Sequence, residues 1–494
     1  MFKPIQAGRR QLQRPLMLSV LSLALLLSGC TVGPDYQQPA ALSASQPMPT
    51  LAQADSSVPA TALTQWWQGF ADEELNRLIG TALKQNQSLA AAEANVARAY
   101  AVFTDSDDNH WPKLQPGVSY QANATPADVS ANGQRSISRQ LQTGTGLSWD
   151  LDLAGKLRRA SEAASARADE AGFAWQQAQL SLIAQVAQNL ADYRGAALRL
   201  SVAEQNLRNL AQISELVKAR RDAGMASDLE LSRVQAQRYQ LESTLPDFVL
   251  AKRRAELTLA ALLGQPADSL QLQQSLPLPA LAAPQALADV SASLQYRPDV
   301  AMAERRLAAA VADIGVATAD LYPSLSLSGF LGFIAAPEFS FGSAQKAWSV
   351  APSLNWQGAD WGSVQARISV AKASEQVALA EFRQTVQDAL SQMQLSLDSY
   401  NLSRRQQLLQ QQQLQATEQA VQLATARFQA GHADFLELLD AQRELLAARD
   451  QQARLTQQNF SRLVDIYRSF AGQLGSPTAV AGTAAGKTEV LAQR

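Results

Sequence analysis

The sequence has almost none of the side chains that carry most enzyme chemistry. Its 494 residues include one cysteine, Cys30, and two histidines, His110 and His432. A disulfide within the chain is impossible, and a zinc site is disfavoured because such sites gather several cysteine or histidine ligands. A Ser–His or Cys–His nucleophile pair is disfavoured for the same reason. We therefore expect no catalytic residue, no metal site, no bound cofactor and no enzyme activity.

Charged residues are also sparse, at 17% of the chain, and the formal net charge is -2. Residues 1–29 carry four basic and no acidic residues, so the charge of the remainder falls to -6. Such a balance gives no basic surface for nucleic acid. Ala, Gln and Leu are abundant instead, a composition that suits long helices packed through small side chains.

The first thirty residues have the layout of an export signal. A basic start precedes an apolar stretch, 16–27, that is shorter than the roughly 20 residues of a membrane-spanning helix. The stretch ends in Leu-Ser-Gly-Cys, with Cys30 at the cleavage position. We predict a signal peptide over residues 1–29 and a covalent lipid on Cys30, the only attached group that we expect. A plain signal peptide with a chance cysteine remains the alternative.

The rest of the chain repeats itself. Trp149 and Gly224 are 75 positions apart, and so are Trp356 and Gly431. Alternating apolar and polar residues, typical of half-buried strands, precede each long proline-free helical field. Each half therefore reads as helix, β-hairpin, very long helix, tight turn and returning helix. We expect strands at 118–123, 147–153, 324–328 and 348–356 and helices at 72–107, 227–263 and 298–320, with a kink at Pro246.

These patterns divide the chain into six parts. Residues 30–64, rich in Pro, Ala, Ser and Gln, are expected to form a lipidated tether, and residues 473–494 a flexible tail. The two repeats and their proline-rich linker lie between these segments. Their expected ranges are 65–264 for the first repeat, 265–296 for the linker and 297–472 for the second repeat.

Physical limits point to an oligomer. A helix of about 70 residues is roughly 100 Å long and must pack against other helices. Four strands cannot close a barrel, and an open sheet edge is not tolerated inside a bilayer. Two copies would give eight strands and a filled interior, whereas three would give twelve strands and room for a lumen. The sequence therefore predicts a homo-oligomer, and an open pore favours three or more subunits.

Several segments resemble the lipoprotein branch, or NodT family, of the TolC-like outer-membrane factors. The similar segments are residues 30–36, the block from Trp66 to Leu89, the block that begins Arg-Pro-Asp at 297, and residues 427–442. The resemblance implies a mainly α fold with a small β part. It implies a trimer with a long α-helical coiled-coil barrel and a 12-stranded transmembrane β-barrel, four strands per protomer.

The resemblance also implies a function. The chain is expected to be the exit channel of a tripartite efflux pump in the outer membrane, lipid-anchored, with a large periplasmic extension. Its expected partners are a periplasmic adaptor (a membrane fusion protein), an inner-membrane transporter and outer-membrane lipid. A type I protein secretion duct, with the same fold, is the alternative. A structural coiled coil or adhesin would not need the duplicated hairpins.

The expected gate lies at the periplasmic turns, where Gly224 and Gly431 would contact the adaptor. By resemblance Asp440 is the first candidate for an acidic ring and Asp434 the second, although solvated surface charges remain an alternative. Phe428 stands where the family often has Tyr, and it cannot donate a hydrogen bond. We therefore expect Arg427 to pair with a carboxylate on a neighbouring helix. An ion pair between Arg233 and Asp440, 207 positions apart, is a further possibility.

Overall fold

The computed structural model describes residues 31–39, 65–126, 136–273, 278, 294, 296–335 and 345–470. The predicted signal peptide, Cys30 and the predicted tail at 473–494 lie outside the described residues. The chain divides into two compact units. Unit 1 comprises Met1–Pro39, Val96–Ala171 and Ala303–Phe382, and unit 2 comprises Ala40–Asn95, Gly172–Met302 and Arg383–Arg494.

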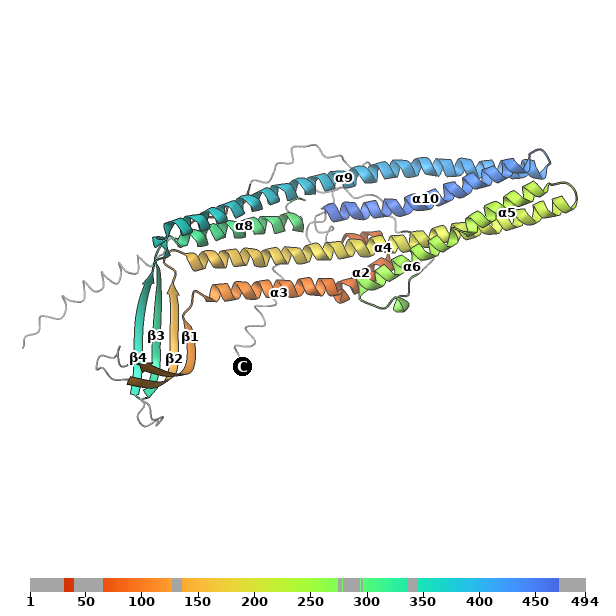
Figure 1. Cartoon of the computed structure of the whole chain (residues 1–494). Coiled ribbons are helices and arrows are strands. Elements are labelled where there is room, and N and C mark those ends of the chain that lie inside the picture. The colour runs from red at the N-terminus through yellow and green to blue at the C-terminus, as the bar shows by residue number, and fades with distance from the viewer. Residues whose placement is uncertain are drawn as a thin grey trace, which may run out of the picture. The chain divides into compact units, whose positions relative to one another are not determined.

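Unit 1 contains an antiparallel sheet of four strands in the order β1-β2-β3-β4 (Figure 1). Each strand predicted from alternation is present, and all four strands run further than the alternation indicated, β2 beginning eleven residues before its predicted range. The pairing of β2 with β3 joins the first repeat to the second, and one edge each of β1 and β4 is unpaired among the described residues. The strands are β1 (Lys113–Thr125), β2 (Ser136–Leu151), β3 (Ser324–Ala335) and β4 (Gln345–Asn355).

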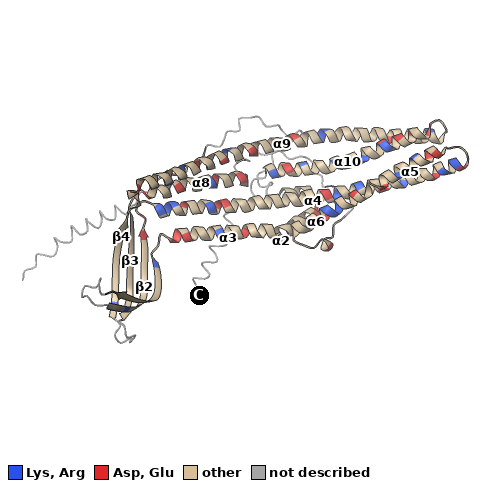
Figure 2. Ribbon diagram, in the orientation of Figure 1, with Lys and Arg blue, Asp and Glu red and all other residues tan. Residues whose placement is uncertain are grey.

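The two faces of this sheet differ in polarity. The register places Leu331 opposite Thr145 on β2 and Trp348 on β4, so their side chains share one face. That face is apolar and exposed: Trp348 is 76% exposed and Leu331 71%. The opposite face carries mainly Gln, Ser, Gly and Ala, and Figure 2 shows few charges on the strands. The apolar face comprises chiefly Leu114, Val118, Tyr120, Leu141, Leu147, Trp149, Leu325, Leu327, Leu331, Phe333, Trp348, Val350 and Leu354.

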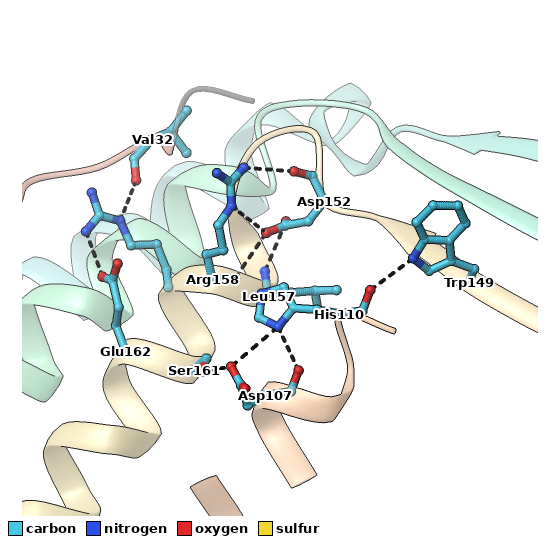
Figure 3. A network of polar contacts seen from close by, with 10 residues as sticks. Val32, Asp107, His110, Trp149, Asp152, Leu157, Arg158, Ser161 and Glu162 are labelled. Atoms are coloured by element: carbon cyan, nitrogen blue, oxygen red, sulfur yellow. Dashed lines mark hydrogen bonds and ion pairs between the residues drawn. The ribbon is translucent and has the colours of Figure 1, made fainter. Parts of the chain in front are cut away.

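Both strand-to-helix junctions use the same tryptophan contact. The indole Nε1 of Trp149 donates to the carbonyl of His110 at 3.0 Å (Figure 3). The indole of Trp356, 207 positions later, donates to the carbonyl of Leu321 at 3.0 Å. Each bond satisfies a carbonyl in the turn that precedes a strand. The internal repeat therefore extends to the hydrogen bonds at its junctions.

Four helices have residues in both units: α3 (Gln87–Asp108), α4 (Lys156–Asp222), α8 (Pro298–Ala319) and α9 (Trp361–Gln429). With 67 and 69 residues, α4 and α9 are each about 100 Å long. In unit 1, α4 and α8 pack closely through a cluster that contains Ala166, Ala308 and Ala309. Arg306 of α8 binds Glu170 of α4 at 2.7 Å beside this small-residue contact.

Within unit 1, the N-terminal residues 31–36 lie against α4 and α8. Arg159 of α4, only 4% exposed, donates to the carbonyl of Val32 at 3.1 Å and binds Asp35 at 2.7 Å. The hydroxyl of Tyr36 donates to Glu304 of α8 at 3.0 Å. The first residues of the tether predicted over 30–64 are therefore held in place by a buried arginine. Residues 40–64 lie outside the described residues.

Unit 2 contains further helices beside its parts of α4 and α9. Two predictions made from the sequence, the unbroken helix over 72–107 and the kink at Pro246, are wrong. The helix expected over 72–107 is broken at Asn86, whose side chain accepts from the N–H of Leu89 and donates to the carbonyl of Leu262. Pro246 does not kink one helix but stands in the first turn of a separate one, where its missing N–H costs nothing. The added helices are η2 (Trp66–Phe70), α2 (Glu73–Gln85), α5 (Asp228–Glu242), α6 (Leu245–Leu263), η3 (Ala267–Ser269) and α10 (Phe435–Phe470).

A buried ion network ties α2 to α4. Arg194 is 2% exposed; it binds Glu74 at 2.8 Å and also binds Asp72, the N-cap residue of α2. Burial opposes ionisation of Asp72, but hydrogen bonds from Arg194 and the N–H of Leu75 hold the pKa of its carboxyl below its ordinary value. The charges are therefore compensated by partners rather than by water.

Aromatic rings fill the core beside this network. The ring of Trp66 is stacked on Tyr467 at 5.0 Å between centroids, and burial raises the pKa of the Tyr467 hydroxyl to about 12.

Among the described residues no helix has both the length and the apolar character needed to cross a membrane.

Candidate functional site

The candidate site is the pair of helical hairpins in unit 2, α4–α5 and α9–α10 (Figure 1). Gly224 and Gly431 have φ angles of 70° and 72°, in the left-handed region that favours glycine. In each turn the N–H after the glycine donates to a carbonyl five residues earlier: Met225 to Arg220 at 2.7 Å, and His432 to Arg427 at 2.9 Å. The turns that the sequence placed 207 positions apart are thus the same Schellman turn.

The returning helices begin at equivalent positions with different caps. Ser227 forms a capping box with Glu230, with reciprocal bonds of 3.3 and 2.7 Å. Asp434, 207 positions after Ser227, stands just before the first residue of α10 and is exposed. A carboxylate there is favoured by the partial positive charge of the helix N-terminus. Asp434 therefore has a structural reason to be acidic, besides any role in a gate.

All four helices share one apolar core at the hairpins. Phe428 of α9 is 5% exposed, and its ring meets that of Phe435 of α10 at 5.8 Å in a T-shaped contact. The core therefore joins the two hairpins within a single protomer. Its buried members are Val217, Val234, Ala424, Phe428, Phe435 and Leu438.

Two repeat-equivalent arginines act differently at this core. Arg427 binds Glu437 on α10 at 2.9 Å, with the two side chains 57% and 44% exposed. This is a pairing with a neighbouring helix, as the sequence predicted. Arg220, 207 positions earlier, instead lies over the ring of Phe428, 4.5 Å from its centroid. Arg427 therefore links α9 to α10, whereas Arg220 links the first hairpin to the second.

Asp440 is exposed on α10 and binds Arg443 of the same helix at 3.3 Å. The possible ion pair between Arg233 and Asp440 is not formed, and Arg233 is exposed. The pair with Arg443 is 66–70% exposed, so solvent screens it and it holds Asp440 only weakly. No group of His, Cys, Asp or Glu in the described ranges is arranged to hold a metal ion.

Known proteins match the chain over nearly its whole length. The family "Outer membrane efflux protein" matches residues 78–265 and 290–472. The chain belongs to this family. Outer membrane protein OprJ of Pseudomonas aeruginosa is 30% identical over 467 residues, which cover 92% of this chain and 95% of OprJ. Nodulation protein T of Rhizobium leguminosarum bv. viciae is 28% identical over 473 residues, covering 93% and 94% of the two chains.

A solved structure agrees with this assignment. The outer-membrane channel OprN has a TM-score of 0.81 and 35% identity, over 90% of this chain and 99% of OprN. Three predictions from the sequence are therefore confirmed: the family, the mainly α fold with a small sheet, and the function in outer-membrane efflux. The family is one of channel proteins, in keeping with the expectation of no enzyme activity.

Sequence reasoning missed two contacts of this outer membrane efflux protein. The ring of Phe428, which the sequence predicts to be a gate residue, is packed inside the protomer beneath Arg220. Arg220, its partner, was not singled out, although it stands 207 positions before Arg427 and the repeat would have pointed to it. Arg194 had no such signal, because its partners lie about 120 positions away in the sequence.

Proposed function

We propose that three copies of the chain close one twelve-stranded barrel through their β1 and β4 edges, as the outer-membrane exit channel of a tripartite efflux pump. The open four-stranded sheet carries the proposal. One face is apolar and exposed, the other is polar, and within the described part of the chain both edge strands have an unpaired edge. A transmembrane barrel presents apolar residues outward and polar residues inward and leaves no edge unpaired. Twelve strands leave a lumen that eight would fill.

The same proposal assigns the partners. Small toxic compounds would enter from an inner-membrane transporter through a periplasmic adaptor, which would contact the turns at Gly224 and Gly431. These turns are suited to contact because a Cβ at either glycine would meet open space. A lipid on Cys30 would add a second attachment to the outer membrane, with the large helical part in the periplasm.

The gate is proposed at the same hairpins. One Asp440 per protomer would form an acidic ring that attracts cations, and Asp434 would form a second. Opening requires hairpins to move, so the contact of Arg220 with Phe428 would hold the closed arrangement together with the Arg427–Glu437 pair. The weak pairing of Asp440 leaves its carboxylate available to ions.

The experiment is to purify the acylated protein from outer membranes, determine its subunit number by native mass spectrometry and record its current in planar bilayers. We expect a trimer and discrete conductance steps. A monomer without conductance would contradict the proposal. In cells, deletion should raise sensitivity to small toxic compounds. Retention of a secreted protein, with compound tolerance unchanged across a broad panel, would instead identify a type I secretion duct.

A further inference from the structure

Phe330 of β3 is a large aromatic residue on the polar face of the sheet. The register sets it opposite Gly146 on β2 and Ser349 on β4, so it shares a face with the Gln and Ser side chains. It is the only aromatic residue on that face among the described strand residues, and it is half-buried. The nearest large apolar residue on the same face is Ile334, four positions along β3.

The ring of Phe330 lies over a pair of glycines. Gly144 and Gly332 are directly opposite each other in the β2–β3 register. A Cβ built on Gly144 would meet the ring at 2.8 Å, and one built on Gly332 would meet it at 2.6 Å. The absence of both side chains therefore lets the ring lean along the sheet instead of projecting from it. Aromatic rings that cover glycines in this way also restore packing to a strand.

The chemistry of the exposed side of the ring follows from its surroundings. Glutamine and serine side chains offer hydrogen bonds to a passing compound but no flat apolar contact. An aromatic face attracts other rings and cations through its quadrupole, most strongly where water is partly excluded. In a symmetric barrel the same ring recurs once in every protomer at one level.

We infer that Phe330 is a specificity-determining residue of the channel. The Phe330 rings of the protomers lie at one level of the barrel and bind flat aromatic compounds as they cross it, aromatic cations most strongly. This inference rests on the proposed trimeric channel, because only there does the polar face line a lumen. The ring lies along the wall and narrows the bore little, so it delays aromatic compounds without blocking small ions.

The test is single-channel recording of the full-length protein in planar bilayers with KCl, with ethidium, a planar aromatic cation, added on the barrel side. In Phe330→Ala we expect the ethidium concentration for half block to rise about tenfold, the scale of a lost cation–aromatic contact. The KCl conductance without ethidium should equal or exceed that of the wild type. Ile334→Ala is the matched control, and it should leave the block unchanged.

Two results would overturn the inference. They are an unchanged half-block concentration in Phe330→Ala, whatever the thermal stability of that variant, and an equal rise in Ile334→Ala. If Phe330→Ala fails to assemble, Phe330→Tyr and Phe330→Leu replace it, and only Tyr should keep the block. Wild-type protein without any channel current would overturn the proposed function and this inference with it, whereas a normal channel indifferent to Phe330 would overturn this inference alone.

Discussion

The guanidinium of Arg220 lies over the ring of Phe428, with its central carbon 4.5 Å from the ring centroid. The two residues stand near the ends of α4 and α9, so the contact joins the first hairpin to the second. A cation over an aromatic face is attracted by the ring itself and needs no hydroxyl group. Phe428 therefore links the two hairpins through Arg220, although it lacks the hydroxyl group that a tyrosine at this position would use for a hydrogen bond.

Replacing Arg220 by Met should make the closed channel leak. The substitution removes the cation but keeps an unbranched side chain over the ring, so the loss is that of a partly exposed cation–aromatic contact, about 0.5–1 kcal/mol. We expect the open probability at low voltage to rise about two- to fivefold, measured in planar bilayers. Thermal stability should fall only slightly, because the apolar core around Phe428 is retained.

Arg427→Ala is the comparison for this variant. It breaks the exposed pair with Glu437, which is worth about 1 kcal/mol or less and weakens with salt. A larger leak in Arg427→Ala than in Arg220→Met would place the main tie within the second hairpin. Unchanged leak in both variants would rule out either arginine as a lock.

Asp440→Asn should weaken cation selectivity, because the amide removes one negative charge per protomer from the proposed ring. The reversal potential in a KCl gradient measures the effect and should move toward zero. Asp434→Asn is the matched variant, since Asn caps a helix N-terminus as well as Asp does. It should shift selectivity less. Equal selectivity of Asp440→Asn and the wild type would exclude Asp440 from the ion path.

Arg194→Met should destabilise unit 2 by about 3–5 kcal/mol, because it leaves Asp72 and Glu74 buried without their cation. Thermal unfolding should show the loss. Arg449→Met, which breaks the more exposed pair with Glu418, should cost about 1 kcal/mol or less. Similar losses in the two variants would mean that burial of the network contributes nothing special.

Stability should also depend on pH through Asp72. Its pKa in the folded protein is below the ordinary value of 3.8, so the folded state favours the ionised form. The resulting stability is fully present above that ordinary value and is lost as the pH falls through the lower, folded value. Thermal unfolding between pH 6 and pH 3 should therefore show a fall near and below pH 4 that is smaller in Asp72→Asn. An identical fall in the variant would assign the acid sensitivity to other carboxylates.

Arg159→Met should release the N-terminal residues 31–36 from α4, because the carbonyl of Val32 and the carboxylate of Asp35 both lose their partner. Limited proteolysis should then cut this segment at least about tenfold faster. Arg158→Met is the control, since the adjacent Arg158 binds Asp152 instead (Figure 3). Equal cleavage of both variants would show that Arg159 does not hold the segment.

Periodicity and spacing predicted the elements that depend on local sequence. Alternation located all four strands, and the equal 75-residue spacings located Gly224 and Gly431, which share one turn geometry. Helix breaks were predicted less well. Asn86 ends α2 by accepting a hydrogen bond from the nearby N–H of Leu89 and donating one to Leu262 of α6, and no periodicity encodes a bond to Leu262. Buried polar contacts such as Arg194 with Glu74 depend on which segments meet in space, and one sequence carries no record of that.

The docking of Thr31 beside Gly155 has a consequence for how deeply the protein sits in its membrane. A Cβ on Gly155 would come within 2.8 Å of the Cα of Thr31, just after β2 ends at Leu151. Residue 30 is one peptide away, about 3.8 Å between Cα atoms. If Cys30 carries the proposed lipid, its acyl chains would enter the periplasmic leaflet of the outer membrane near the level where β2 ends. About 9–11 residues of a tilted strand cross a bilayer, whereas β2 has 16. Measured from that level, the far end of β2 would extend beyond the outer leaflet.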